Sequence, residues 1–142
     1  MTNNDLSKKR ILWIEDESER LEGMAQVLRS AGAEVVFAKT LSDALKSVEK
    51  NIFDLIIIDC MMPIGNDCGI DAPPREAGVY FLKTLKDKNI IKAPILVLSA
   101  IVDSILVSKF RALGVSSILQ KPITQKQLVD NLLKTISSLD RD

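Results

Sequence analysis

The stretch Leu55-Ile56-Ile57-Ile58-Asp59 decides the fold of this chain. Four consecutive apolar residues, three of them β-branched, predict a strand that is buried on both faces, as in a parallel sheet. The charge of Asp59 at the end of this strand is costly to bury unless it has a partner or a function. A second apolar run, Ile11-Leu12-Trp13-Ile14, ends in the acids Glu15 and Asp16. The two runs predict carboxylates that converge at one edge of a sheet, an arrangement typical of a cation site.

Apolar periodicity elsewhere predicts an alternation of strands and helices. The five expected strands cover residues 10–14, 34–38, 54–58, 95–98 and 117–120, and a helix is expected after each of them. Such an alternation favours a doubly wound α/β fold, in which helices cover both faces of a parallel sheet. We expect one domain over residues 10–139, a flexible tail over residues 1–9 and a short tail over residues 140–142.

The composition excludes several classes of function. A chain of 142 residues with zero formal net charge is about one domain and lacks the broad basic surface that favours nucleic-acid binding. The absence of histidine excludes histidine-based catalysis and histidine-ligated metals. The two cysteines, Cys60 and Cys68, are too few for a disulfide framework and fit a reducing compartment. No apolar stretch approaches the length of a membrane span, so we expect a cytoplasmic protein.

Polar residues follow four of the expected strands at their carboxyl ends, where doubly wound folds bind their ligands. These residues are Glu15, Asp16, Asp59, Ser99 and Lys121. Clustered carboxylates repel one another unless a cation neutralises them, and oxygen ligands without imidazole favour Mg²⁺ or Mn²⁺. An ammonium and a hydroxyl beside one aspartate suit the transfer of an anionic group to that aspartate, as in phosphoryl transfer.

Over residues 10–139 the sequence resembles the receiver domain of two-component response regulators. The resemblance rests on an ordered set of short motifs at successive strand ends: Glu15-Asp16, Asp59 with Met62-Pro63, Ser99-Ala100 and Lys121-Pro122. It implies the flavodoxin-like (βα)5 fold with strand order 2-1-3-4-5. It also implies a signalling domain that catalyses only its own phosphorylation and dephosphorylation, and is not otherwise an enzyme.

The resemblance implies a role for each residue of the site. Asp59 would accept a phosphoryl group from a histidine kinase or a phosphotransfer protein. Asp16, Asp59 and the backbone carbonyl of Met61 would bind the metal directly, and Glu15 would act through water. Lys121 would pair with the phosphoryl oxygens.

The same resemblance implies how phosphorylation is reported to other proteins. Ser99 would hydrogen-bond the phosphoryl group and shift a pre-existing equilibrium between an inactive and an active state. The Lys121-Pro122 peptide would be cis. The apolar helix expected over residues 103–113 would offer a surface to a downstream protein or to a second copy of the chain.

Two features depart from the family pattern. An inserted loop of about residues 64–77 separates Met62-Pro63 from the next expected helix. This loop could bind a partner, shield the site, help to bind the cation through Asp67 or Asp71, or be a neutral insertion. Ile118 stands where many receivers carry an aromatic switch residue, so the usual serine–aromatic coupling is not expected here.

Two other functions stay open. A pseudo-receiver would use the same fold as a binding module and never take a phosphoryl group. A Mg²⁺-dependent phosphohydrolase with Asp59 as nucleophile is disfavoured, because Met61 stands where the haloacid dehalogenase pattern requires a second acid. No DNA-binding or catalytic output domain fits in this chain, so we expect a stand-alone module whose output passes through another protein.

Overall fold

Strands and helices alternate along the chain in the computed structural model, which describes residues 6–59, 76–89, 93–100 and 103–139. The strands are β1 (Arg10–Ile14), β2 (Glu34–Ala38), β3 (Leu55–Asp59), β4 (Ile95–Ser99) and β5 (Ser117–Gln120). The helices are the 3₁₀ turn η1 (Ser18–Leu21), α1 (Glu22–Ser30), α2 (Leu41–Lys50), α3 (Ala77–Asp87), α4 (Ser104–Ala112) and α5 (Gln125–Leu139). Every strand lies within one residue of its predicted bounds.

The five strands form one parallel sheet in the order β2-β1-β3-β4-β5. This confirms the predicted flavodoxin-like order. The chain leaves β1 toward β2 on one side and returns to β3 on the other, with Ile11 opposite Leu55 and Ile14 opposite Ile58. The strand order therefore reverses between β1 and β3, and the carboxyl ends of these two strands flank the point of reversal.

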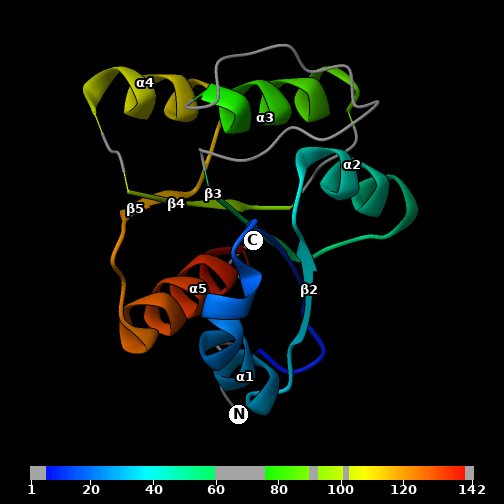
Figure 1. Cartoon of the computed structure of the whole chain (residues 1–142), viewed down its shortest axis with the longest axis vertical. Coiled ribbons are helices and arrows are strands. Elements are labelled where there is room, and N and C mark those ends of the chain that lie inside the picture. Colours follow the sequence, from blue (N-terminus) through cyan, green and yellow to red (C-terminus); the bar gives the residue numbers. More distant parts are fainter. Residues whose placement is uncertain (1–5, 60–75, 90–92, 101–102, 140–142) are drawn as a thin grey trace.

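Helices cover both faces of the sheet, as Figure 1 shows, with α1 and α5 on one face and α2, α3 and α4 on the other. Alternate strand residues enter the two layers: Leu12 and Ile14 pack with α2, α3 and α4, whereas Ile11 and Trp13 pack with α1 and α5. Trp13 stacks on Phe37 with ring centroids 5.4 Å apart. Because both faces are covered, the strands are continuously apolar, and this is the property that identified β3 in the sequence.

Side-chain caps fix the starts of three helices. The hydroxyl of Thr40 accepts the Asp43 N–H at 3.0 Å at the start of α2. Before α5, Thr124 Oγ1 accepts the Gln127 N–H at 3.1 Å and Gln127 Oε1 accepts the Thr124 N–H at 2.9 Å, a reciprocal capping box. Asp103 caps α4, so this helix begins one residue after the start predicted for the 103–113 segment.

Residues 6–9, which belong to the predicted tail, contact the domain. Leu6 is 2 % exposed and packs in the core layer of α1 and α5. The Lys8 N–H donates to the Gly32 carbonyl at 2.9 Å. Gly32 has φ of +98°, and a Cβ there would lie 2.9 Å from Ser7 Cα, so only glycine allows both the turn and this close approach. A single buried leucine has no periodicity, and for that reason the sequence pattern missed it.

Part of the predicted inserted loop lies outside the described residues, as do residues 1–5 and 140–142. Helix α3 begins at Ala77 with Glu76 before it, so the predicted 64–77 segment extends one residue too far into the helix. None of the described helices combines the length and the apolar character that a membrane span needs.

Replacing Leu6 with alanine is expected to lower the free energy of unfolding by about 2 kcal/mol. This is the lower end of the range for buried leucines, whose cost depends on how far the surroundings collapse into the cavity. The matched control is Ile52→Ala, since Ile52 is 86 % exposed and such changes cost less than about 0.5 kcal/mol. Urea denaturation followed by circular dichroism measures both, and equal losses would show that Leu6 is not part of the core.

Candidate functional site

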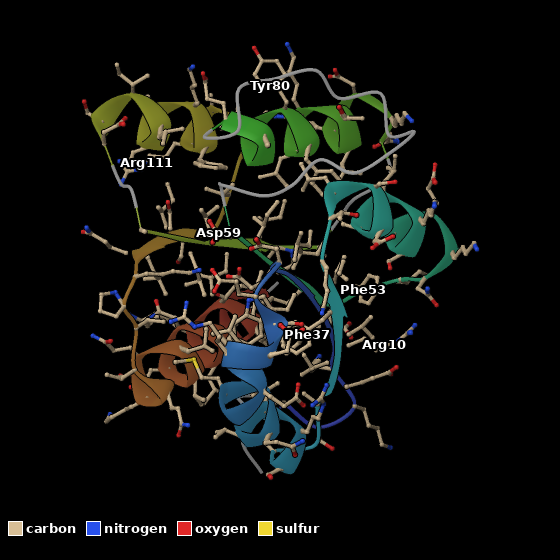
Figure 2. All side chains as sticks on the ribbon, in the orientation of Figure 1. Arg10, Phe37, Phe53, Asp59, Tyr80 and Arg111 are labelled. Atoms are coloured by element: carbon tan, nitrogen blue, oxygen red, sulfur yellow. The ribbon has the colours of Figure 1, made fainter. Side chains whose placement is uncertain are left out.

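The carboxyl ends of four strands bring the predicted residues to one edge of the sheet. Glu15 follows β1, Asp59 ends β3, Ser99 ends β4 and Lys121 follows β5. Figure 2 shows Asp59 at the sheet, between the two helical layers. Ser99 is 2 % exposed. The described part of the chain thus assembles these four side chains where the strand order predicts a site.

Lys121 reaches from the end of β5 to carboxylates on two other strands. Its Nζ donates to Glu15 Oε1 at 2.6 Å and to Asp59 Oδ2 at 2.7 Å. The backbone N–H of Lys121 donates to the Ser99 carbonyl at 2.8 Å, which ties it to the end of β4. The peptide between Lys121 and Pro122 is cis, as the family resemblance implied. One ammonium therefore bridges two acids that are distant in sequence.

Glu15 is buried at this edge, with 3 % of its surface exposed, whereas the neighbouring Asp16 is exposed. The Glu15 N–H donates to the Ala38 carbonyl at 2.9 Å, which continues the pairing between β1 and β2. The Glu15 carboxylate also accepts the Glu17 N–H at 3.3 Å. Two donors, one of them charged, offset part of the cost of its burial.

Burial dominates the pKa of Glu15 and raises it above the usual value, because the charged carboxylate loses hydration. Lys121 lowers this pKa without outweighing burial, and the nearby acids Asp16 and Asp59 raise it further. For Lys121, burial alone would lower the pKa, but the hydrogen bonds to Asp59 and Glu15 outweigh burial and raise it. The ammonium therefore stays charged at neutral pH, and the site keeps a fixed positive charge.

The donor chemistry of the site fits a hard divalent cation, because Glu15, Asp16 and Asp59 all offer carboxylate oxygens. In the ranges that the structure describes, however, no three acidic or thiol side chains are gathered as a ready metal cage. Lys121 instead bridges Glu15 and Asp59. Met61, whose backbone carbonyl was predicted to complete the ligand set, lies outside the described residues.

Two ion pairs at the rim of the site were not singled out from the sequence. Arg20 Nη1 donates to Glu17 Oε2 at 2.7 Å within one helical turn, and this i,i+3 spacing could have predicted the pair. Lys39, which follows β2, pairs with Glu19 in η1. That pair depends on the approach of two distant segments, so no local pattern predicts it.

A cavity of about 420 Å³ opens beside Lys121 and also borders Glu15. Much of its wall is apolar and comes from Leu21, Met24 and Ile123. A space of this size admits a side chain or a small molecule rather than one ion. This wall combines residues of α1 and its preceding turn with Ile123 after β5, and no local sequence pattern predicts that these distant segments meet.

Comparison with families of known proteins gives a match over most of the chain. A family model described as the response regulator receiver domain matches residues 11–133. The transcriptional regulatory protein PdtaR of Mycobacterium tuberculosis is 30 % identical over 130 residues, which cover 91 % of this chain and 57 % of that protein. The sensor protein GacS of Pseudomonas syringae is 30 % identical over 128 residues, which cover 88 % of this chain and 13 % of that protein. The chain thus spans little more than half of one relative and a small part of the other.

Solved structures show the same likeness. The non-phosphorylated HemR receiver domain from Leptospira biflexa has a TM-score of 0.75 and 27 % identity, covering 92 % of this chain and 95 % of that one. A CheY-like response regulator receiver domain protein from Methanospirillum hungatei has a TM-score of 0.78, covering 95 % of this chain and 98 % of that one. Its identity is 21 %, so this second likeness concerns the fold alone.

Glu15→Gln is expected to raise the free energy of unfolding at neutral pH when divalent cations are removed with EDTA. A carboxyl whose pKa is raised on folding binds its proton more tightly in the folded chain, so its charged form destabilises that chain. This cost is fully present above the folded pKa and disappears as the pH falls to the usual value of 4.5. The gain from glutamine should therefore shrink across that window and vanish below it.

Urea denaturation at a series of pH values measures this gain. The matched control is Glu49→Gln, since Glu49 is exposed and its stability difference should change little over the same series. A gain from Glu15→Gln that stayed constant down to pH values below 4.5 would show that the charge of Glu15 is not its source.

Proposed function

The chain belongs to the response regulator receiver domain family, and on that premise we propose that it acts in two-component signalling as a phosphoacceptor. Asp59 accepts a phosphoryl group from the phosphohistidine of a histidine kinase or of a phosphotransfer protein. A carboxylate oxygen of Asp59 forms a bond to phosphorus while the bond between phosphorus and the donor nitrogen breaks. The Asp59 side chain is 14 % exposed, which leaves one side open to a donor.

The observation that carries this proposal is the position of Lys121 Nζ, 2.7 Å from Asp59 Oδ2. Phosphoryl transfer depends mainly on positioning and on neutralising the charge of the phosphoryl oxygens. An ammonium held beside the nucleophilic carboxylate supplies that charge without reorganisation. The raised pKa of Lys121, which results from its hydrogen bonds to Asp59 and Glu15 despite its burial, keeps it charged.

Mg²⁺, or Mn²⁺ with the same preference for oxygen ligands, is the proposed cofactor. The cation would be held directly by Asp16, Asp59 and the backbone carbonyl of Met61, and by Glu15 through water. When bound, the cation adds positive charge for the transferred group. Glu15 also has a second task, because it accepts a hydrogen bond from Lys121 and so orients the ammonium.

Phosphorylation is passed on through Ser99 and the segment that follows it. Ser99 ends β4, close in sequence to the start of α4 at Ser104, and its hydroxyl bonds to the phosphoryl group. Ile118 on β5 is partly buried and packs against the core layer of α2, α3 and α4. Its branched aliphatic side chain replaces the aromatic switch of other receivers, so output runs through α4 or through the 64–77 segment.

The proposed partners follow from the exposed surface and the charge. Ile105 on α4 is 67 % exposed, and the 103–113 segment is the docking surface for a downstream protein or for a second copy of the chain. The 64–77 segment is a further candidate surface for partners. With zero formal net charge the domain binds protein rather than nucleic acid, and we propose a cytoplasmic location.

Incubation with acetyl phosphate and Mg²⁺ is expected to add one phosphoryl group to Asp59. An aspartyl phosphate is an acyl phosphate, so the adduct should be labile in base. Intact-mass spectrometry at low pH measures it. Removal of Mg²⁺ with EDTA should abolish the adduct, because Lys121 alone leaves the other acids of the site uncompensated.

Asp59→Asn is expected to remove the adduct, whereas Asp87→Asn, which changes an exposed acid at the end of α3, should leave it unchanged. An adduct that persisted in Asp59→Asn would contradict the site assignment. No adduct on the native chain, together with no binding of beryllofluoride, would favour a pseudo-receiver that works only as a binding module.

Lys121→Met is expected to slow phosphorylation of Asp59 by about a hundredfold or more, since one preorganised positive donor is lost. Lys126→Met is the matched control, because Lys126 is exposed and pairs only with Asp130 in the same helix among the contacts observed. The initial rate of adduct formation from acetyl phosphate compares the two variants. Equal rates would exclude a role for Lys121 in the transfer.

A further inference from the structure

Helix α4 is held to the domain by few apolar contacts. Only Leu106 and Phe110 of its residues are buried, and both belong to the core layer of α2 and α3. Ile105, one residue before Leu106, is 67 % exposed. A helix with so little buried surface has a low free-energy cost of displacement.

An ion pair ties α4 to the start of α3. Lys109 Nζ donates to Glu76 Oε1. Lys109 lies on α4 and Glu76 directly precedes α3, and their side chains are 44 % and 22 % exposed. Each charge also suits its own helix. Glu76 stands at the amino terminus of α3 and Lys109 lies in the last turn of α4, where the respective helix dipoles favour an anion and a cation.

The ion pair borders a cavity instead of packed core. A surface hollow of about 250 Å³ is lined by Glu76, before α3, and by residues that run from the cap of α4 to its last turn: Asp103, Ile105, Leu106 and Lys109. Packed interiors resist displacement because their side chains interdigitate. Here α4 and Glu76 face an open hollow, so the ion pair from Lys109 supplies a restraint that packing does not.

The position of α4 makes this restraint relevant to the site. The backbone of β4 ends at Ser99, which is 2 % exposed, and α4 starts only a few residues later at Ser104. A rearrangement at Ser99 that displaces the chain after it therefore has only a few residues to cross before it meets the first turn of α4. A contact that fixes α4 opposes such a rearrangement, because two-state coupling is reciprocal.

We propose that the Glu76–Lys109 pair is a clasp that holds α4 in its unphosphorylated position and thereby sets how readily the domain switches. This inference rests on the proposed function of Asp59 only for its regulatory part. The clasp itself is an interaction of the unmodified chain. Breaking it shifts the population toward the state that phosphorylation favours, by the free energy of the ion pair.

Hydrogen exchange of the full chain, without phosphodonor, tests the clasp. Glu76→Gln, Lys109→Met and the double variant form a double-mutant cycle. Each single variant is expected to speed exchange of the α4 amides by about two- to fivefold, the range for partly exposed ion pairs. The double variant should be no faster than the faster single variant, since the interaction can be lost only once.

Two outcomes of this exchange experiment would overturn the clasp. The first is an unchanged exchange rate in α4, and the second is a double variant whose effect is the product of the two single effects. Lys126→Gln is the control, because it breaks the exposed pair between Lys126 and Asp130 in α5. It should leave the exchange of α4 unchanged, and the β-strand amides report any loss of global stability in each variant.

Binding of beryllofluoride with Mg²⁺ tests the regulatory part. Both single variants are expected to reach half-saturation at a concentration two- to fivefold lower than the native chain, the same factor as in exchange. Faster exchange with unchanged beryllofluoride affinity would overturn the regulatory role. A native chain that binds no beryllofluoride at all would overturn the proposed function and, with it, that role, while a non-additive exchange cycle would still establish the contact.

Discussion

Two acids from neighbouring strands are brought to the edge of a buried sheet, and the ammonium of Lys121 makes this possible. Glu15 and Asp59 each approach Lys121 Nζ within hydrogen-bonding distance. Without a cation between them, two partly desolvated carboxylates would repel each other and lose hydration together. The lysine belongs to the segment after β5, so its hydrogen bonds connect segments that are far apart in the sequence. The same requirement for positive charge makes this edge suitable for an anionic group in transfer.

The alternation of the strands was predictable because it follows from local chemistry. The run Leu55–Ile58 is apolar at every position, and it can be buried only where helices cover both faces of a sheet. The capping pairs Thr40 with Asp43 and Thr124 with Gln127 are also local, because each joins residues three apart at a helix start. The strand order was predicted on another basis, because it came from a resemblance between short motifs and not from apolar periodicity.

Long-range contacts were the part that the sequence could not supply. The packing of Leu6 against α1 and α5 needs a close approach of the chain to Gly32. Neither residue belongs to a sequence pattern that predicts this contact. The pairing of Glu76 with Lys109 requires two helices to meet. The site was predicted more fully, because each of its residues ends a recognisable strand. Even there, the sequence did not indicate that Lys121 would bridge both Glu15 and Asp59, since the strand order alone sets no side-chain distances.

The stacking of Trp13 on Phe37 has a practical consequence for optical studies of this domain. Trp13 is the single tryptophan of the chain, is 1 % exposed and packs in the layer of α1 and α5. Its emission therefore reports on the hydration of that layer. Loosening of α4, on the opposite face of the sheet, would leave the fluorescence nearly unchanged. A denaturation curve recorded by tryptophan emission alone would make the two layers look like one cooperative unit even if the α4 layer opened first.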